Sequence, residues 1–185
     1  MTDTSLDSII LDAGHGLGSP KGWGNYREWV GNRKFARSLE IYLAGHNAVD
    51  MINSCPVDIS LKDRVEFANM FPKSIYISIH SNGSANHDAR GHVVFYYEGS
   101  RKSKMLAQCI SDELTRMSGI PSRGIKATRR LFVLNKTKSP AVLVERFFHD
   151  NDEDLELGNS PREIDTQACA VSQGILNYKR LVGDL

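Results

Sequence analysis

The strongest constraint on the fold is a short apolar run that ends in glycines and a histidine. Residues 9–16 read I-I-L-D-A-G-H-G. The first three have the pattern of a buried strand, and Gly14 and Gly16 punctuate its end. His15 is therefore expected just past the carboxyl end of a strand, at the edge where open α/β sheets bind their ligands.

Two later apolar runs carry polar side chains that a strand does not need. Residues 74–82, S-I-Y-I-S-I-H-S-N, form a β-branched run that reaches His80 near its end. Ala141–Phe148, A-V-L-V-E-R-F-F, holds Glu145 inside an apolar strand, which is a costly place for a carboxylate without a task. Two histidines at strand ends and this carboxylate together suggest a metal site with a base beside it.

The rest of the chain alternates between strand and helix patterns. Its 185 residues are enough for one domain with a substantial core, here about residues 8–181. The alternation predicts an α/β fold, a single-domain three-layer sandwich with a mostly parallel mixed sheet of about six strands flanked by helices. Helices are expected at 26–43, 60–70, 100–118, 151–157 and 161–181, further strands at 49–52, 92–97 and 131–134, and a basic turn at 121–130.

Composition excludes several classes of partner. Lys and Arg number 23 against 22 Asp and Glu, so a net charge of +1 argues against nucleic acid or a membrane surface as the main partner. No apolar run reaches the ~18 residues of an integral membrane segment, and residues 1–8, M-T-D-T-S-L-D-S, lack the features of a signal peptide. The three cysteines form no C-x-x-C pattern, so neither a disulfide framework nor a cysteine zinc site is expected.

The histidines and acidic residues suit hydrolytic zinc chemistry. Such sites take three protein ligands from His and Asp or Glu and leave a position for water, while a nearby carboxylate moves the proton. His15, Glu28 and His80 would be the ligands and Glu145 the base. Their spacing is long and unlike the local H-E-x-x-H signature, so the residues alone do not show whether they converge. Glu28, at the start of a helix, could equally serve the helix dipole.

Four short motifs follow one another along the chain. They are D-A-G-H-G at 12–16, S-I-H-S-N at 78–82, S-R-G-I-K at 122–126 and P-A-V-L-V-E at 140–145. In this order the chain resembles the zinc-dependent N-acetylmuramoyl-L-alanine amidases of the type-3 family, which includes bacterial cell-wall amidases and the catalytic domains of many phage endolysins. The resemblance extends from about residue 8 to residue 181.

The resemblance implies a reaction and roles for named residues. One Zn²⁺ would be held by His15, Glu28 and His80, with Glu145 as the catalytic residue that takes a proton from water and gives it to the leaving amine. The bond cut would join the lactyl group of N-acetylmuramic acid to the first L-alanine of the stem peptide in peptidoglycan. The chain would be one catalytic domain, a monomer, without a separate cell-wall-binding domain.

Substrate contacts are indicated by fewer signals. Asn82 and Arg123 lie in the matching motifs, and Trp23, in a glycine-rich loop, would suit a sugar platform. Arg146 departs from the family, whose members commonly have a small or apolar residue after the catalytic glutamate. Arg146 could pair with Glu145 or point to the opposite face, and strand alternation favours the second. His149 is expected at the surface or behind the metal ligands.

The biological setting suggested by the sequence is phage-type host lysis. An amidase made in the cytoplasm without a signal peptide would reach the wall after release through a membrane lesion of the holin type. Two alternatives stay open. One is a catalytically silent cell-wall-binding or regulatory domain, and the other is a zinc peptidase that acts on another peptidoglycan amide.

Overall fold

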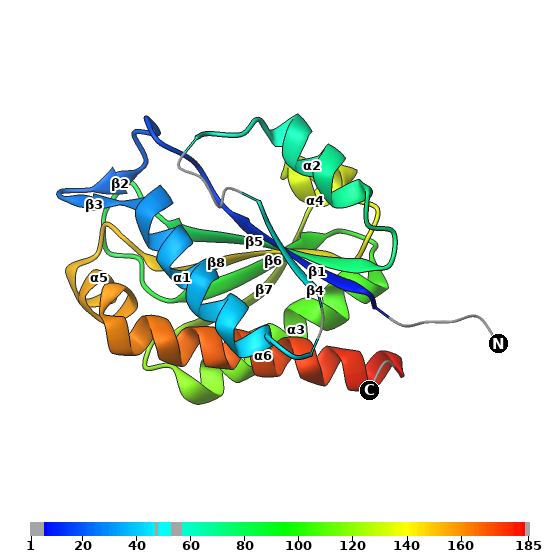
Figure 1. The fold of residues 1–185 in the computed structure, drawn as a ribbon. Helices are drawn as coiled ribbons and strands as arrows, with labels where there is room; N and C mark the ends of the chain where they lie inside the picture. The colour runs from blue at the N-terminus through cyan, green and yellow to red at the C-terminus, as the bar shows by residue number, and fades with distance from the viewer. Residues whose placement is uncertain (1–5, 47, 53–56, 184–185) are drawn as a thin grey trace.

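Strand β1 (Ser8–Ala13) lies inside a six-stranded sheet whose order is β4-β1-β5-β8-β6-β7. The structure, a computed structural model, describes residues 6–46, 48–52 and 57–183. Cys55, part of the cysteine prediction, and the first five residues, part of the signal-peptide prediction, lie outside these ranges. All neighbouring strands run parallel except β6 and β8, which are antiparallel. This mostly parallel mixed sheet, with helices on both faces (Figure 1), confirms the predicted α/β sandwich.

Most of the other elements follow the expected alternation of strands and helices, but residues 26–27, predicted to begin a helix, form a short strand, and the helix begins at Glu28. The strands are β2 (Gly22–Trp23), β3 (Tyr26–Arg27), β4 (Ala48–Ile52), β5 (Ser74–Asn82), β6 (His92–Tyr97), β7 (Ser122–Thr128) and β8 (Ala141–Phe148). The helices are α1 (Glu28–Leu43), α2 (Leu61–Asn69), α3 (Arg101–Met117), α4 (Phe132–Lys136), α5 (Asp152–Asn159) and α6 (Pro161–Val182). Among the described residues, none of these helices is long and apolar enough to cross a membrane.

Alternate residues of the central strands belong to two separate apolar clusters, one on each face of the sheet. Ile9 and Leu11 of β1 pack with α1, α3 and α6, whereas Ile10 packs with α2 and α4 on the other face. Figure 1 shows these two groups of helices on opposite sides of the sheet. Because successive side chains of a strand point to opposite faces, Asp12 shares the face of Ile10.

Two sequence predictions about the region between α3 and β8 are wrong. Residues 121–130, predicted to be a basic turn, contain β7, an edge strand whose exposed charges are typical of sheet edges. Residues 131–134, predicted to be a strand, are the residue before α4 and its first three residues. A four-residue apolar run cannot be told from a buried helical turn by its pattern, and Val133 and Leu134 fill the cluster under α2.

A buried ionic group fixes α2 to the sheet. The guanidinium of Arg64 donates to the Asp12 carboxylate through Nη1 and to the carbonyl of Ile59 through Nε at 2.9 Å. The hydroxyls of Tyr76 and Ser78 also donate to Asp12. Arg64 and Asp12 are 3% and 1% exposed, so neither charge has water to replace its partner.

Replacement of Arg64 by Met is therefore expected to lower the free energy of unfolding by about 3–5 kcal/mol, because it leaves the Asp12 charge buried and uncompensated. Urea unfolding followed by circular dichroism measures this loss. The matched control is Lys62→Met on the same helix, whose pair with Glu66 is exposed and contributes little. Equal losses in the two variants would contradict the assigned role of Arg64.

Candidate metal centre and catalytic site

The site lies at the carboxyl ends of three neighbouring parallel strands, where such sheets bind their ligands. His15 follows β1 by two residues, His80 lies near the end of β5, and Glu145 lies in β8 opposite His80 in the strand register. Glu28 is the first residue of α1. The parallel pairing thus brings together four side chains that are far apart in the sequence.

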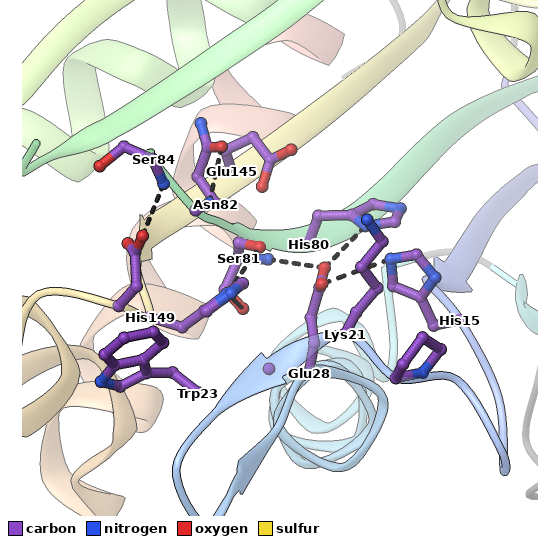
Figure 2. A pocket seen from close by; sticks show the side chains of 14 residues that line it. His15, Lys21, Trp23, Glu28, His80, Ser81, Asn82, Ser84, Glu145 and His149 are labelled. Carbon is purple, nitrogen blue, oxygen red and sulfur yellow. Dashed lines mark hydrogen bonds and ion pairs between the residues drawn. The ribbon is translucent and has the colours of Figure 1, made fainter. Parts of the chain in front are cut away.

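Three of these side chains form a group suited to a metal ion. One ligand atom from each of His15, Glu28 and His80 lies within 4.8 Å of the other two. Nε2 of His15 is 3.3 Å from one oxygen of Glu28, and Nδ1 of His80 is 2.9 Å from the other (Figure 2). Two imidazoles and a carboxylate are ligands that zinc prefers, so the donor set matches that metal.

The loop after β1 is shaped for the approach of the two histidine rings. A side chain at Gly14 would place its Cβ 2.2 Å from Cε1 of His80, so only glycine leaves room for that ring. His15 itself has a φ of 63°, a left-handed conformation that is uncommon for residues other than glycine. The two rings meet edge to face with their centroids 4.9 Å apart.

Glu28 is buried and held from several directions. Its Oε1 accepts hydrogen bonds from the backbone N–H of Ser81 at 3.2 Å and from Nδ2 of Asn32 at 3.4 Å. Burial alone would raise the pKa of Glu28, but hydrogen bonds with His15 and His80 outweigh it and hold the pKa well below the usual range. Glu28 therefore stays a carboxylate, which is the form that binds a cation.

Glu145 has the opposite electrostatic environment. Burial raises its pKa to about 7, and its buried Oε2 has no hydrogen-bond partner among the described residues. A carboxyl group with a pKa near neutrality can accept a proton and return it within one reaction cycle. Glu145 faces the same pocket as the three candidate ligands.

Arg146 points away from Glu145, as strand alternation predicts. Its side chain is fully buried on the opposite face of β8, where Nη1 donates to the carbonyl of Gly158 and to Oε1 of Gln167, both at 3.3 Å. Its guanidinium lies over the ring of Phe35, 4.5 Å from the centroid. Arg146 thus stabilises the packing of α1, α5 and α6 rather than forming an ion pair with Glu145.

A polar cluster behind Glu28 was not predicted from the sequence. Oγ of Ser81 lies 3.1 Å from the hydroxyl of Tyr26 and 3.1 Å from Nδ1 of His149. His149 is 7% exposed and lines the same pocket as the candidate ligands, so it reaches the site and does not lie at the surface. Asn32 was also missed, although its position one turn after Glu28 was the available signal, since residues four apart share a helix face.

The predicted substrate contacts fall into two groups. Asn82 and Trp23 line a polar pocket of about 470 Å³ that contains the candidate ligands and Glu145. Arg123 does not line this pocket among the described residues; its Nη1 donates to the carbonyl of Arg90 and its guanidinium lies 5.2 Å from the centroid of Phe148.

Comparisons with known proteins agree on one family. The sequence matches the family described as N-acetylmuramoyl-L-alanine amidase over residues 9–177. The amidase LytC of Bacillus subtilis strain 168 is 29% identical over 179 residues, which cover 94% of this chain and 36% of LytC. The endolysin of Bacillus phage SPP1 is 29% identical over 188 residues, which cover 95% of this chain and 68% of the endolysin.

A solved structure gives the same result for the fold. The N-acetylmuramoyl-L-alanine amidase from Clostridium difficile 630 superposes with a TM-score of 0.90 at 26% identity, covering 96% of this chain and 98% of that one. The chain spans 46%, 25% and 36% of the length of three curated relatives. Because the family match runs from β1 into α6 and takes in all four residues of the site, the chain belongs to the N-acetylmuramoyl-L-alanine amidase family.

Proposed function

We propose that this chain hydrolyses the amide bond between the lactyl group of N-acetylmuramic acid and the L-alanine of the stem peptide in peptidoglycan, with one zinc ion as cofactor. The observation that carries the proposal is the meeting of His15, Glu28 and His80 beside Glu145, which has a raised pKa. Family membership supports the reaction type.

In this mechanism His15, Glu28 and His80 hold the metal. A zinc ion held there would supply Lewis-acid chemistry, lowering the pKa of a water molecule and polarising a carbonyl group. Ser81 and Asn32 orient the Glu28 carboxylate through the hydrogen bonds described above, so that its oxygens remain directed toward both histidines. A ligand held in this way loses little freedom when the ion binds.

Glu145 moves the proton. It accepts a proton from the attacking water and then donates it to the nitrogen of the departing L-alanine, which leaves as a free amine. The raised pKa supports both roles, because the group must be a base in the first step and an acid in the second. Asn82 and Trp23, from the walls of the polar pocket, are proposed to contact the substrate, with Arg123 on the neighbouring surface.

The proposal also includes a biological role, the lysis of a host cell by a phage-type enzyme. Its support is the similarity to the phage SPP1 endolysin over 95% of this chain, although LytC is as similar. In this setting the protein acts as a monomer on the cell wall after its release through a holin-type membrane lesion. A catalytically silent wall-binding domain and a zinc peptidase remain the alternatives, and the experiments below separate them.

Digestion of purified peptidoglycan tests the bond that is cut. Metal-free protein is expected to be inactive, and one equivalent of zinc is expected to restore release of stem peptides with N-terminal alanine while the glycan strands stay intact. Mass spectrometry of the products measures this. Cleavage within the stem peptide would indicate a peptidase, and no cleavage by zinc-loaded protein would favour the silent domain.

Substitution of one ligand tests the metal site independently of activity. His15→Ala is expected to lower zinc affinity by at least about tenfold, because it removes one of three protein ligands. Competition with a chromophoric chelator measures the affinity. His46→Ala, at an exposed position beyond α1, is the matched control and should bind zinc as the unmodified protein does. Equal affinities in the two variants would rule out His15 as a ligand.

Glu145→Gln is expected to keep zinc and to lower kcat by at least about 100-fold, since the amide cannot accept the proton. Turnover of soluble peptidoglycan fragments and zinc content are measured on the same preparation. Glu66→Gln, on the exposed side of α2, is the control and should leave both unchanged. Activity close to the unmodified level in Glu145→Gln would refute the assignment of the proton carrier.

A further inference from the structure

A second pocket, of about 420 Å³, adjoins the candidate metal centre on the α2 and α4 side. It shares His15 and His80 with the polar pocket, so the two pockets adjoin at the site where the reaction is proposed to occur. Its walls are more apolar and come from the start of α2 and from α4 and the residue before it. The apolar lining residues are Ile59, Leu61, Leu131, Phe132, Val133 and Leu143.

The position of Glu145 distinguishes the two pockets. Glu145 lines the polar pocket together with Lys21, Asn82 and Ser84, whereas it does not line the apolar pocket. The nitrogen of the scissile amide must come within reach of Glu145 to receive its proton. The peptide, on the amine side of this bond, carries many polar and charged groups, and these match the polar lining of this pocket. The acyl side must leave the metal centre in another direction.

We infer that the apolar pocket beside His15 and His80 receives the acyl side of the substrate, namely the lactyl group and the sugar ring of a muramoyl residue. This inference rests on the proposed function and adds to it the orientation of the substrate in the site. The apolar part of the lining agrees with this assignment, because the lactyl methyl and the C–H face of a pyranose ring are apolar. The charged side chains that also line the pocket, Asp12, Asp58 and Arg64, are paired with one another.

Phe132 is the residue that would contact the sugar. Its side chain is 40% exposed at the first position of α4, and Leu61 across the pocket is 56% exposed. Both line the pocket, so part of their exposed apolar surface faces the space that the muramoyl residue would fill. A sugar ring against the Phe132 ring would remove apolar area from water on both sides. In this orientation Trp23 contacts the peptide, and Phe132 takes the sugar-platform role that the sequence assigned to Trp23.

Two substrates with the same peptide test the inference. One is N-acetylmuramoyl-L-alanyl-D-isoglutamine and the other is D-lactoyl-L-alanyl-D-isoglutamine, which lacks the sugar. For Phe132→Ala we expect kcat/KM to fall about tenfold on the muramoyl substrate and to stay unchanged on the lactoyl substrate, because only the first contacts the ring. For Trp23→Ala, an aromatic of similar exposure, we expect equal losses on both substrates. Ile41→Ala, 74% exposed on α1 and in neither pocket, should leave both unchanged.

Binding of free N-acetylmuramic acid gives a second measurement that needs no turnover. Zinc-loaded Glu145→Gln protein, titrated with the sugar and followed by NMR, is expected to bind about tenfold more weakly when Phe132 is also replaced by Ala. The Trp23 replacement should leave this affinity unchanged.

The opposite results would overturn the inference without touching the reaction. Equal losses on both substrates for Phe132→Ala, or a loss confined to the muramoyl substrate for Trp23→Ala, would place the sugar elsewhere while peptidoglycan digestion still succeeded. If zinc-loaded protein released no stem peptides from peptidoglycan, the proposed function would fail, and the assignment of the apolar pocket would fall with it.

Discussion

Parallel pairing of β1, β5 and β8 is the constraint on which the site depends. Each strand ends at the same edge of the sheet, so His15, His80 and Glu145 meet there although no local motif links them. The helix α1 then needs only to begin at that edge for Glu28, its first residue, to reach both histidines. The candidate metal centre is thus a consequence of the sheet topology and of where one helix starts.

The face of the sheet that α2 and α4 cover also carries polar residues next to the site. Asp12 and Ser78 pair across β1 and β5, and together with Arg64 they line the apolar pocket beneath His80. The ionic group that fixes α2 is therefore also a wall of the pocket. Its buried charges are compensated within the protein, which leaves the nearby pocket surface to the apolar side chains of α2 and α4.

Many of the strands and helices could be predicted from the sequence, and the pattern that predicted them differs between elements. Strands β5 and β8 were predicted because each is a nearly continuous apolar run, α3 because its apolar residues recur with the period of a helix, and α6 because Pro161 suits a first helical turn. Strand β7 was missed because an edge strand with exposed charges has no such period, and α4 because it is too short to show one.

For the site, the residues alone indicated three ligands and a base but not whether they converge, and the resemblance implied that they do. Ser81 and Tyr26 could not be found in this way, since the contact of Ser81 with Glu28 and that of Tyr26 with Ser81 arise from tertiary packing alone.

The register of β5 and β8 has a consequence for how such proteins diverge. His80 and Glu145 face each other on the last regular pair before the register shifts, and Asn82 then lies opposite Phe148. Loops that follow this pair can lengthen, shorten or change composition without altering the separation of the imidazole and the carboxylate. The walls of the pocket beyond this pair can therefore differ in shape and charge while the imidazole and the carboxylate keep their places.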